Sequence, residues 1–368
     1  MKTPQTENKE KIVPILSHAL NSLLEEAATK SITVMEVCGT HTVAIFRHGL
    51  KALLPKSFKL VSGPGCPVCV TDQSEIDAAI SIAEREDSIV ATYGDMLRVP
   101  GSWTSLQECR ARGRSVKVVT SVTQALDLAE ENPDKNVVFL GVGFETTAPA
   151  TALALIEAKK RKLDNFLVLC MHKTVPLALE ALANSEELSL DGFLLPGHVS
   201  VIIGLNPYRF IPEKYGKACA IAGFEPFEIM AGLLEIARQV IKGEPTIKSM
   251  YPRAVRPEGN KTAQELLDKV FEPCNAHWRG LGEIPLSGYK IRPEFEIHDA
   301  SLRLNIEKKP SPLPTGCRCG DVLKGLISPI ECPLFGRACT PMKPVGPCMV
   351  SSEGSCAAQY KYDRKGQL

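Results

Sequence analysis

The sequence predicts an α/β protein with two similar doubly wound domains that face a cleft, followed by a third, small cysteine-rich domain. Strand-like apolar runs alternate with helical patterns from residue 31 to about residue 245, which indicates parallel sheets. Turn-rich and proline-rich stretches follow, and six of the 13 cysteines fall between residues 317 and 356. A chain of 368 residues is long enough for two or three domains of roughly 100–200 residues each.

The N-terminal segment, residues 1–30, is predicted to be a helix over 8–29 that packs on the third domain. Its apolar residues recur at helical spacing and define one face. These residues are Ile12, Leu16, Leu20, Leu23 and Leu24.

Two α/β domains are expected next, over residues 31–121 and 122–245. Helical patterns separate the strand-like runs throughout. The strand-like runs, some with the loop that follows them, are 31–37, 58–63, 88–94, 116–121, 136–147, 165–172, 191–204 and 217–226. The third domain is assigned to 246–368, because "MYPRAVRPEGN" (250–260) and "KKPSPLPTG" (308–316) are typical of linkers.

The composition limits the partners and the cellular location that can be expected of this protein. The formal net charge is +1, from 43 basic and 42 acidic residues, so neither nucleic acid nor an anionic membrane is expected as the main partner. The N-terminus lacks a signal-peptide pattern, and no apolar run approaches the roughly 18 residues of a membrane span. We therefore expect a cytoplasmic protein, in which thiols stay reduced and many cysteines indicate metal, cluster or redox chemistry.

Ligands of open α/β sheets bind at the carboxyl ends of the strands, so the loops after the strands are the candidate site. "CGTHT" places Cys38 near a helix N-terminus, where unpaired N–H groups favour a thiolate. His41 would pair with that thiolate, transfer a proton or bind a metal; the alternative is a buried cysteine beside a surface histidine on an ordinary turn. The remaining strand-end loops carry Glu145, His198 and Glu225.

A C-x-x-C motif, Cys66 and Cys69 in "GPGCPVC", suits either a redox-active dithiol or two ligands of one metal. A structural zinc ion would need two more ligands, which Cys38 and His41 could supply. His198 in "PGHVS" follows a strand, although a lone histidine is more often structural.

The C-terminal cysteines include a C-x14-C-x6-C-x16-C pattern. Four thiolates converging from loops suit a cubane cluster, and the same thiolates suit a closed zinc site, so the residues leave both open. The four cysteines of the pattern are Cys317, Cys332, Cys339 and Cys356.

Five motifs, "CGTHT", "GPGCPVC", "GFETTAP", "PGHVS" and "GPCMVSSEG", resemble the HypD family of [NiFe]-hydrogenase maturation factors, in family order and over nearly the whole chain. The resemblance implies a scaffold on which the Fe(CN)2CO unit of the hydrogenase is assembled. It implies a stable complex with the small chaperone HypC and transient cyanide transfer from HypE, whose cyanide is made with HypF. The free protein is expected to be a monomer.

The same resemblance implies roles for individual residues. Cys38 would hold the iron jointly with a HypC cysteine, and Cys66 and Cys69 would be a redox-active pair beside it. His41, His198 and Glu353 would support this site. In the third domain, Cys317, Cys332, Cys339 and Cys356 would bind a [4Fe-4S] cluster; no role carries over to Cys319 and Cys348.

Two other functions remain open from the residues. One is a thiol–disulfide oxidoreductase in which the cluster feeds Cys66 and Cys69 without any iron scaffold. The other is a zinc-stabilised interaction module without redox chemistry.

Overall fold

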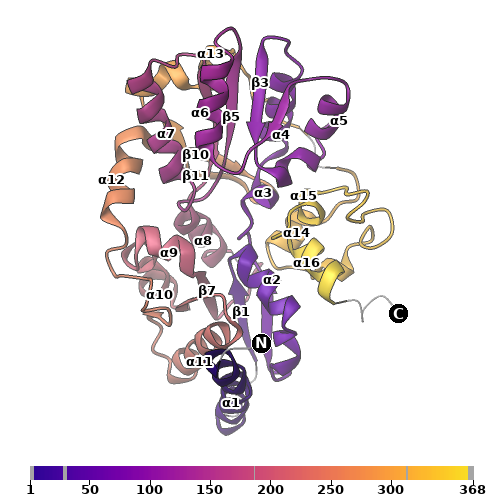
Figure 1. The fold of residues 1–368 in the computed structure, drawn as a ribbon. Helices are drawn as coiled ribbons and strands as arrows, with labels where there is room; N and C mark the ends of the chain where they lie inside the picture. Colours follow the sequence, from indigo (N-terminus) through magenta and orange to yellow (C-terminus); the bar gives the residue numbers. More distant parts are fainter. Residues whose placement is uncertain (1–3, 28–30, 186, 312–313, 364–368) are drawn as a thin grey trace.

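Two parallel β-sheets form the two ends of the molecule, and the C-terminal segment lies beside the junction between them (Figure 1). The computed structural model describes residues 4–27, 31–185, 187–311 and 314–363, with side chains from residue 12 onward. The lower sheet of Figure 1 has the order β2-β1-β7-β8-β9 and the upper sheet the order β4-β3-β5-β6. The lower strands are β1 (Ile32–Glu36), β2 (Phe58–Ser62), β7 (Gly192–Pro196), β8 (Ala218–Ala222) and β9 (Ile247–Ser249); the upper ones are β3 (Ser88–Thr92), β4 (Val116–Val118), β5 (Asn136–Gly143) and β6 (Phe166–His172).

Both sheets are wound in the same way, which agrees with the predicted pair of doubly wound α/β units. In each sheet the second strand along the chain lies outside the first, and the third and fourth continue on the other side. The winding direction therefore reverses between β1 and β7 and again between β3 and β5. Ligands of such sheets bind beyond the strand ends at this switch point.

Helices cover both sheets, and none of the described helices is both long and apolar enough to cross a membrane. The first half of the chain contains α1 (Pro4–Glu26), α2 (Gly39–Arg47), α3 (Pro67–Val70), α4 (Gln73–Ala83), α5 (Leu106–Ala111), α6 (Val122–Glu131), α7 (Ala148–Arg161) and α8 (Val175–Ala183). The second half contains α9 (Gly197–Ile203), α10 (Phe210–Tyr215), α11 (Pro226–Lys242), α12 (Lys261–Val270), α13 (Ala300–Arg303), α14 (Cys319–Leu323), α15 (Pro347–Val350) and α16 (Ser355–Tyr362). Short 3-10 helices are η1 (Leu50–Leu53), η2 (Gly94–Arg98), η3 (Asn206–Tyr208), η4 (Pro293–His298) and η5 (Pro329–Glu331).

The sheets do not follow the division at residues 121 and 122 that the sequence suggested. Strands β1 and β2 pair with β7, β8 and β9, whereas β3 and β4 pair with β5 and β6. The chain leaves the lower sheet after β2, builds the whole upper sheet, and returns through α8. The alternation of strands and helices is the same in either arrangement, so it does not reveal which sheet a strand joins.

A hairpin of β10 (Phe271–Trp278) and β11 (Gly282–Ile291) lies across both crossings between the sheets. It forms isolated bridges to the outgoing crossing, Thr71 with Trp278, and to the returning crossing, Lys173 with Gly288. The buried side chains of Lys173 and Glu75 also join the crossings through an ion pair of 2.9 Å. The two crossings are therefore tied to each other and to the hairpin.

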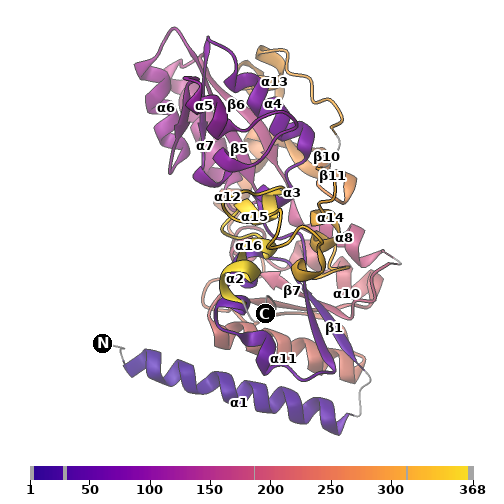
Figure 2. The same ribbon diagram turned by 90° about the vertical axis from the view of Figure 1, so that its right-hand side faces the viewer.

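The predicted third domain, residues 246–368, is not a single unit. Its first part contributes β9 to the lower sheet and packs α12 on α7 of the upper unit. The cysteine-rich part with α14, α15 and α16 lies at the junction (Figure 2). Its buried residues, Met349 and Val350 among them, belong to the same apolar core as Met35 and Val37. A segment too poor in apolar residues for its own core thus shares the core of the α/β units.

Helix α1 packs on α11 of the lower unit rather than on the third domain, as both views show (Figures 1 and 2). Leu20 and Leu24 of α1 are buried in one apolar cluster with Leu233 and Ile236 of α11. The periodicity defines the apolar face of α1 but not the surface that covers it.

The α1–α11 contact predicts a measurable asymmetry between two apolar residues of α1. Leu20 is 0% exposed and Ile15 is 65% exposed. Leu20→Ala should lower the free energy of unfolding by about 2–5 kcal/mol, because it leaves a cavity. Ile15→Ala should change it by less than about 0.5 kcal/mol. Urea denaturation of both variants checks this, and equal effects would contradict the packing described.

Candidate functional site

Cys38 lies at the switch point of the lower sheet, between the carboxyl ends of β1 and β7. It is the N-cap residue of α2, and its side chain is 1% exposed. Its Sγ lies 3.8 Å from Nδ1 of His198, the second residue of α9 after β7. Two of the predicted site residues, 160 positions apart, therefore meet where this fold class binds ligands.

His41 of α2 contacts the loop that follows β8. Its Nε2 lies 2.9 Å from the carbonyl oxygen of Gly223, and its Nδ1 is buried without a partner in the described structure. The ring of Phe224 contacts both histidines, with its centroid 5.1 Å from that of His41 and 5.1 Å from that of His198. Burial lowers the pKa of both histidines to about 4, so both imidazoles are neutral near pH 7.

The electrostatics at Cys38 oppose the thiolate that the helix N-terminus suggested. Burial raises the pKa of the Cys38 thiol, and the nearby Glu353 and Glu36 carboxyl groups raise it further. Glu36 is itself buried: it accepts hydrogen bonds from the Cys38 N–H (3.2 Å) and the Thr42 hydroxyl (2.6 Å). The chain alone therefore favours a neutral thiol, and a bound metal ion would supply the charge that removes its proton.

Cys66 and Cys69 form a disulfide in the structure, with their Cα atoms 5.2 Å apart. Cys66 is the N-cap residue of α3, and its Sγ accepts a hydrogen bond from the Cys69 N–H (3.2 Å). The loop before the motif lies directly against Cys38: the Gly39 N–H donates to the Gly65 carbonyl (3.1 Å). A Cβ atom at Gly65 would overlap the backbone N and Cα of Cys38. The backbone segments that carry Cys38 and the Cys66–Cys69 disulfide are therefore in direct contact.

The loop 351–353 brings the cysteine-rich segment to the same place. Glu353 accepts a hydrogen bond from the Thr40 hydroxyl (2.7 Å) and lies so close to Gly39 that a Cβ there would be 2.5 Å from the Glu353 Cβ. Ser351 lies 3.3 Å from Cys66 Sγ and 3.2 Å from an oxygen of Asp95, which belongs to the upper unit. This loop contacts both α/β units and the disulfide.

Pairwise interactions link the six C-terminal cysteines into one group. A hydrogen bond with Cys319 raises the pKa of Cys317, and one with Cys356 raises the pKa of Cys348. Electrostatic interactions complete the group: they join Cys339 to Cys317 and Cys332, and Cys348 to Cys317.

The donor type fits an iron–sulfur cluster or zinc, since all six side chains are thiols. In the part of the chain that the structure describes, however, no three or more His, Cys, Asp or Glu side chains are placed as a metal site requires. The C-terminal cysteines therefore form a thiol-rich group.

Comparisons with known proteins identify the family of the chain. A model of the HypD family, described as "Hydrogenase formation hypA family", matches residues 13–363. The chain belongs to the HypD family. It is 45% identical over 338 residues to the hydrogenase maturation factor HypD of Cupriavidus necator, which covers 90% of this chain and 89% of that protein. It is 41% identical over 362 residues to the hydrogenase maturation factor HypD of Escherichia coli, covering 96% and 95%.

In this HypD-family chain a buried guanidinium lies beside the thiol-rich group, and no motif of the sequence predicts it. Arg279 donates from Nε to the Thr71 carbonyl and from Nη2 to Gln73, each at 2.9 Å, and its Nη1 is buried without a partner in the described structure. Its positive charge opposes the rise in the pKa of Cys317 and Cys348. Arg279 thus places a cation where thiolates would need one.

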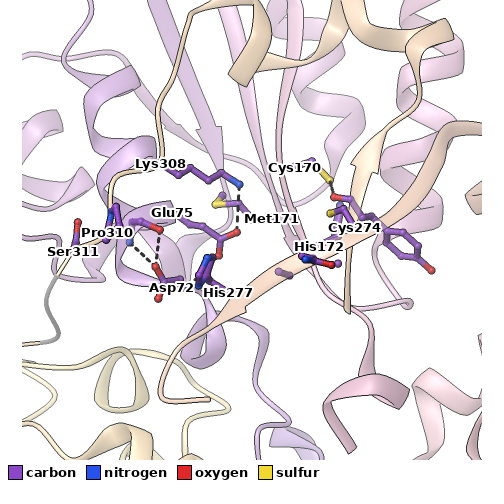
Figure 3. Close-up of a pocket in the computed structure, with 15 residues that line it drawn as sticks. Asp72, Glu75, Cys170, Met171, His172, Cys274, His277, Lys308, Pro310 and Ser311 are labelled. Carbon is purple, nitrogen blue, oxygen red and sulfur yellow. Dashed lines mark hydrogen bonds and ion pairs between the residues drawn. The ribbon is translucent and has the colours of Figure 1, made fainter. Parts of the chain in front are cut away.

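A cavity of about 270 Å³ lies away from these residues, at the crossings between the sheets (Figure 3). Lys308 pairs with Glu75 (3.5 Å) on one side of it, while Cys170 and Cys274 lie together on its other side. None of the site residues expected of a HypD-family protein lines this cavity.

Glu145 of "GFETT" lies outside the thiol site and spans the junction between the units. Its Oε1 accepts a hydrogen bond from the Val175 N–H at the start of α8 (3.0 Å), and its Oε2 is buried without a partner in the described structure. Burial raises the pKa of Glu145 to about 7. Glu225, the other carboxylate singled out from the sequence, forms a capping box at the start of α11.

The contact between Gly65 and Cys38 predicts that a methyl group added at Gly65 will strongly destabilise the fold. Gly65→Ala should lower the free energy of unfolding by more than about 2 kcal/mol, because the backbone of Cys38 would have to move. Gly94→Ala is the control, since its nearest contact would be an ordinary 3.8 Å. Urea denaturation compares the two; a tolerated Gly65→Ala would contradict the close approach.

Burial of Glu145 predicts a pH dependence of stability. Because its folded pKa lies above the ordinary value of 4.5, its contribution is fully present below about pH 4.5 and is lost as pH rises through about 7. The amide of Glu145→Gln keeps the acceptor for Val175 and does not ionise. The unfolding free energy of the variant relative to wild type should therefore rise by up to about 3 kcal/mol between pH 5 and 8.5. A constant difference would contradict the shifted pKa.

Proposed function

We propose that this HypD-family protein is the scaffold on which the Fe(CN)2CO unit of [NiFe]-hydrogenase is assembled, with Cys38 as the iron ligand. The observation that carries the proposal is the position of Cys38 Sγ, buried at the switch point beside His198 and against the loop of the Cys66–Cys69 pair. The iron unit is the substrate of this site.

The surroundings of Cys38 suit an iron cation. A thiolate is a soft ligand that holds low-spin iron carrying CO and cyanide. The charged groups that act on the Cys38 thiol are the carboxyl groups of Glu353 and Glu36, which would balance the charge of Fe²⁺. Burial of the side chain keeps water from competing for the iron. His198 lies at the sulfur, and His41 and Glu353 hold the loops on either side of it.

Cys66 and Cys69 act in the proposal as the electron donor or acceptor beside the iron, and the C-terminal cysteines act as the ligands of a [4Fe-4S] cluster. The ligands proposed are Cys317, Cys332, Cys339 and Cys356. The cluster would supply single electrons to the dithiol. The contact between Ser351 and Cys66 supports this proposal, because it brings the cysteine-rich segment to the disulfide.

The proposed partners are HypC, which would contribute a second cysteine to the iron, and HypE, which would deliver cyanide to the complex. The protein itself is proposed to be cytoplasmic and monomeric when free.

Infrared spectroscopy of the chain co-purified with HypC under anaerobic conditions tests the proposal. Cys38→Ala should abolish the bands of iron-bound CO and cyanide while the visible absorbance of the cluster stays. Cys219→Ala is the matched control, since it removes a fully buried thiol from β8 of the same sheet; its bands should persist. Unchanged bands in Cys38→Ala would refute the iron ligand.

The same samples separate the two other functions. Cys332→Ala should lose iron and sulfide from the cluster. Zinc without iron or sulfide in the wild type would instead favour the interaction module. Disulfide reductase activity of the isolated chain, lost in Cys66→Ser and present without any CO or cyanide bands, would favour the oxidoreductase, which the observed disulfide also supports.

A further inference from the structure

The sulfur of Cys66 is closed off from water and has two polar contacts in the described structure. Cys66 is 4% exposed and Cys69 is 0% exposed. One contact of Cys66 Sγ is the Cys69 N–H (3.2 Å), and the other is the Ser351 hydroxyl (3.3 Å). A proton that reaches this sulfur must come through such a neighbour.

The two neighbours differ in what they can do. A peptide N–H stabilises a negative sulfur by donating a hydrogen bond, but it does not give up its proton near neutral pH. A hydroxyl group can pass its proton on and take another from a second partner. Ser351 is therefore the contact through which a proton can move to Cys66.

Ser351 has such a second partner. Its hydroxyl donates a hydrogen bond to Oδ2 of Asp95 (3.2 Å), and its Oγ accepts one from the Glu353 N–H (3.2 Å). Asp95 belongs to η2 of the upper unit and is partly exposed. The same Oδ2 accepts hydrogen bonds from the N–H (2.9 Å) and the hydroxyl (3.0 Å) of Ser352, which fix its position. A continuous line of exchangeable groups thus leads from the surface to Cys66 Sγ.

We propose that Asp95 and Ser351 form the proton route to the Cys66–Cys69 pair. Reduction of the disulfide takes two electrons and two protons and yields two thiols. As the S–S bond breaks and Cys66 Sγ gains negative charge, the Ser351 hydroxyl turns from Asp95 and gives its proton to this sulfur. The Asp95 carboxylate takes up a proton from hydronium in the solvent and passes it to Ser351, so both residues end the step as they began it. Cys66 hands this first proton to the neighbouring Cys69 Sγ and takes the second proton along the same route.

The route rests on the redox role of the pair in the proposed function, where an iron–sulfur centre supplies the electrons one at a time. It extends that function, because it assigns work to two residues outside the thiols. Ser351 contacts the reacting sulfur directly, and Asp95 acts through Ser351.

Pulse radiolysis of the full, anaerobically purified chain tests the route. The formate-derived carbon dioxide radical anion transfers one electron to the disulfide, and the visible band of the disulfide radical anion decays as a proton arrives. Wild type should show a solvent deuterium isotope effect on this decay. Ser351→Ala and Asp95→Asn should slow the decay by at least about tenfold and lose the isotope effect, because neither side chain can pass a proton.

Two variants separate proton transfer from structure. Ser351→Thr keeps the hydroxyl group and should retain the wild-type decay. Ser352→Ala removes a hydrogen bond to the same Asp95 oxygen without touching Cys66, and should also retain it. Peptide mass spectrometry checks that every variant forms the Cys66–Cys69 bond before the pulse.

Wild-type decay with an intact isotope effect in Ser351→Ala would overturn the route while leaving the redox pair in place. Wild-type decay in Asp95→Asn alone would remove Asp95 from it. A wild-type protein without the disulfide radical band would overturn both the route and the redox role, so the two failures are distinguishable.

Discussion

The site depends on close backbone contact at the carboxyl edge of the lower sheet. Gly65 lies against the backbone of Cys38, and Gly39 lies against the backbone and side chain of Glu353, so three segments of the chain meet at two glycines. A Cβ atom at either glycine would push the segments apart. The sulfur atoms share one region because these two residues have no side chain.

The loop 351–353 turns this contact into a connection between all parts of the molecule. Glu353 is tied to Thr40 of the lower unit, and Ser351 and Ser352 are tied to Asp95 of the upper unit. The cysteine-rich segment is therefore packed at the junction of the two sheets rather than attached as an appendage. Ser351 therefore contacts both Cys66 of the lower unit and Asp95 of the upper unit.

Burial controls the chemistry of the residues at this junction. It keeps His41 and His198 neutral and raises the pKa of Cys38, whose position at a helix N-terminus suggested the opposite effect. The helix-terminus argument needs only local sequence, whereas desolvation depends on segments hundreds of residues away. The same applies to Glu36, which looked like an ordinary strand residue and is a buried hydrogen-bond acceptor for Cys38 and Thr42.

The sequence by itself determined the α/β class, the strands β1 to β8, the strand-end positions of Cys38, Cys66, Cys69 and His198, and the family, because these follow from local periodicity and contiguous motifs. Only the tertiary structure decided that the chain crosses twice between the sheets, that α1 covers α11, and that the cysteine-rich segment shares the common core. It alone brought Ser351, Asp95 and Arg279 to the thiols. Strand pairing and desolvation are contacts between residues far apart in the chain, and local pattern carries no record of them.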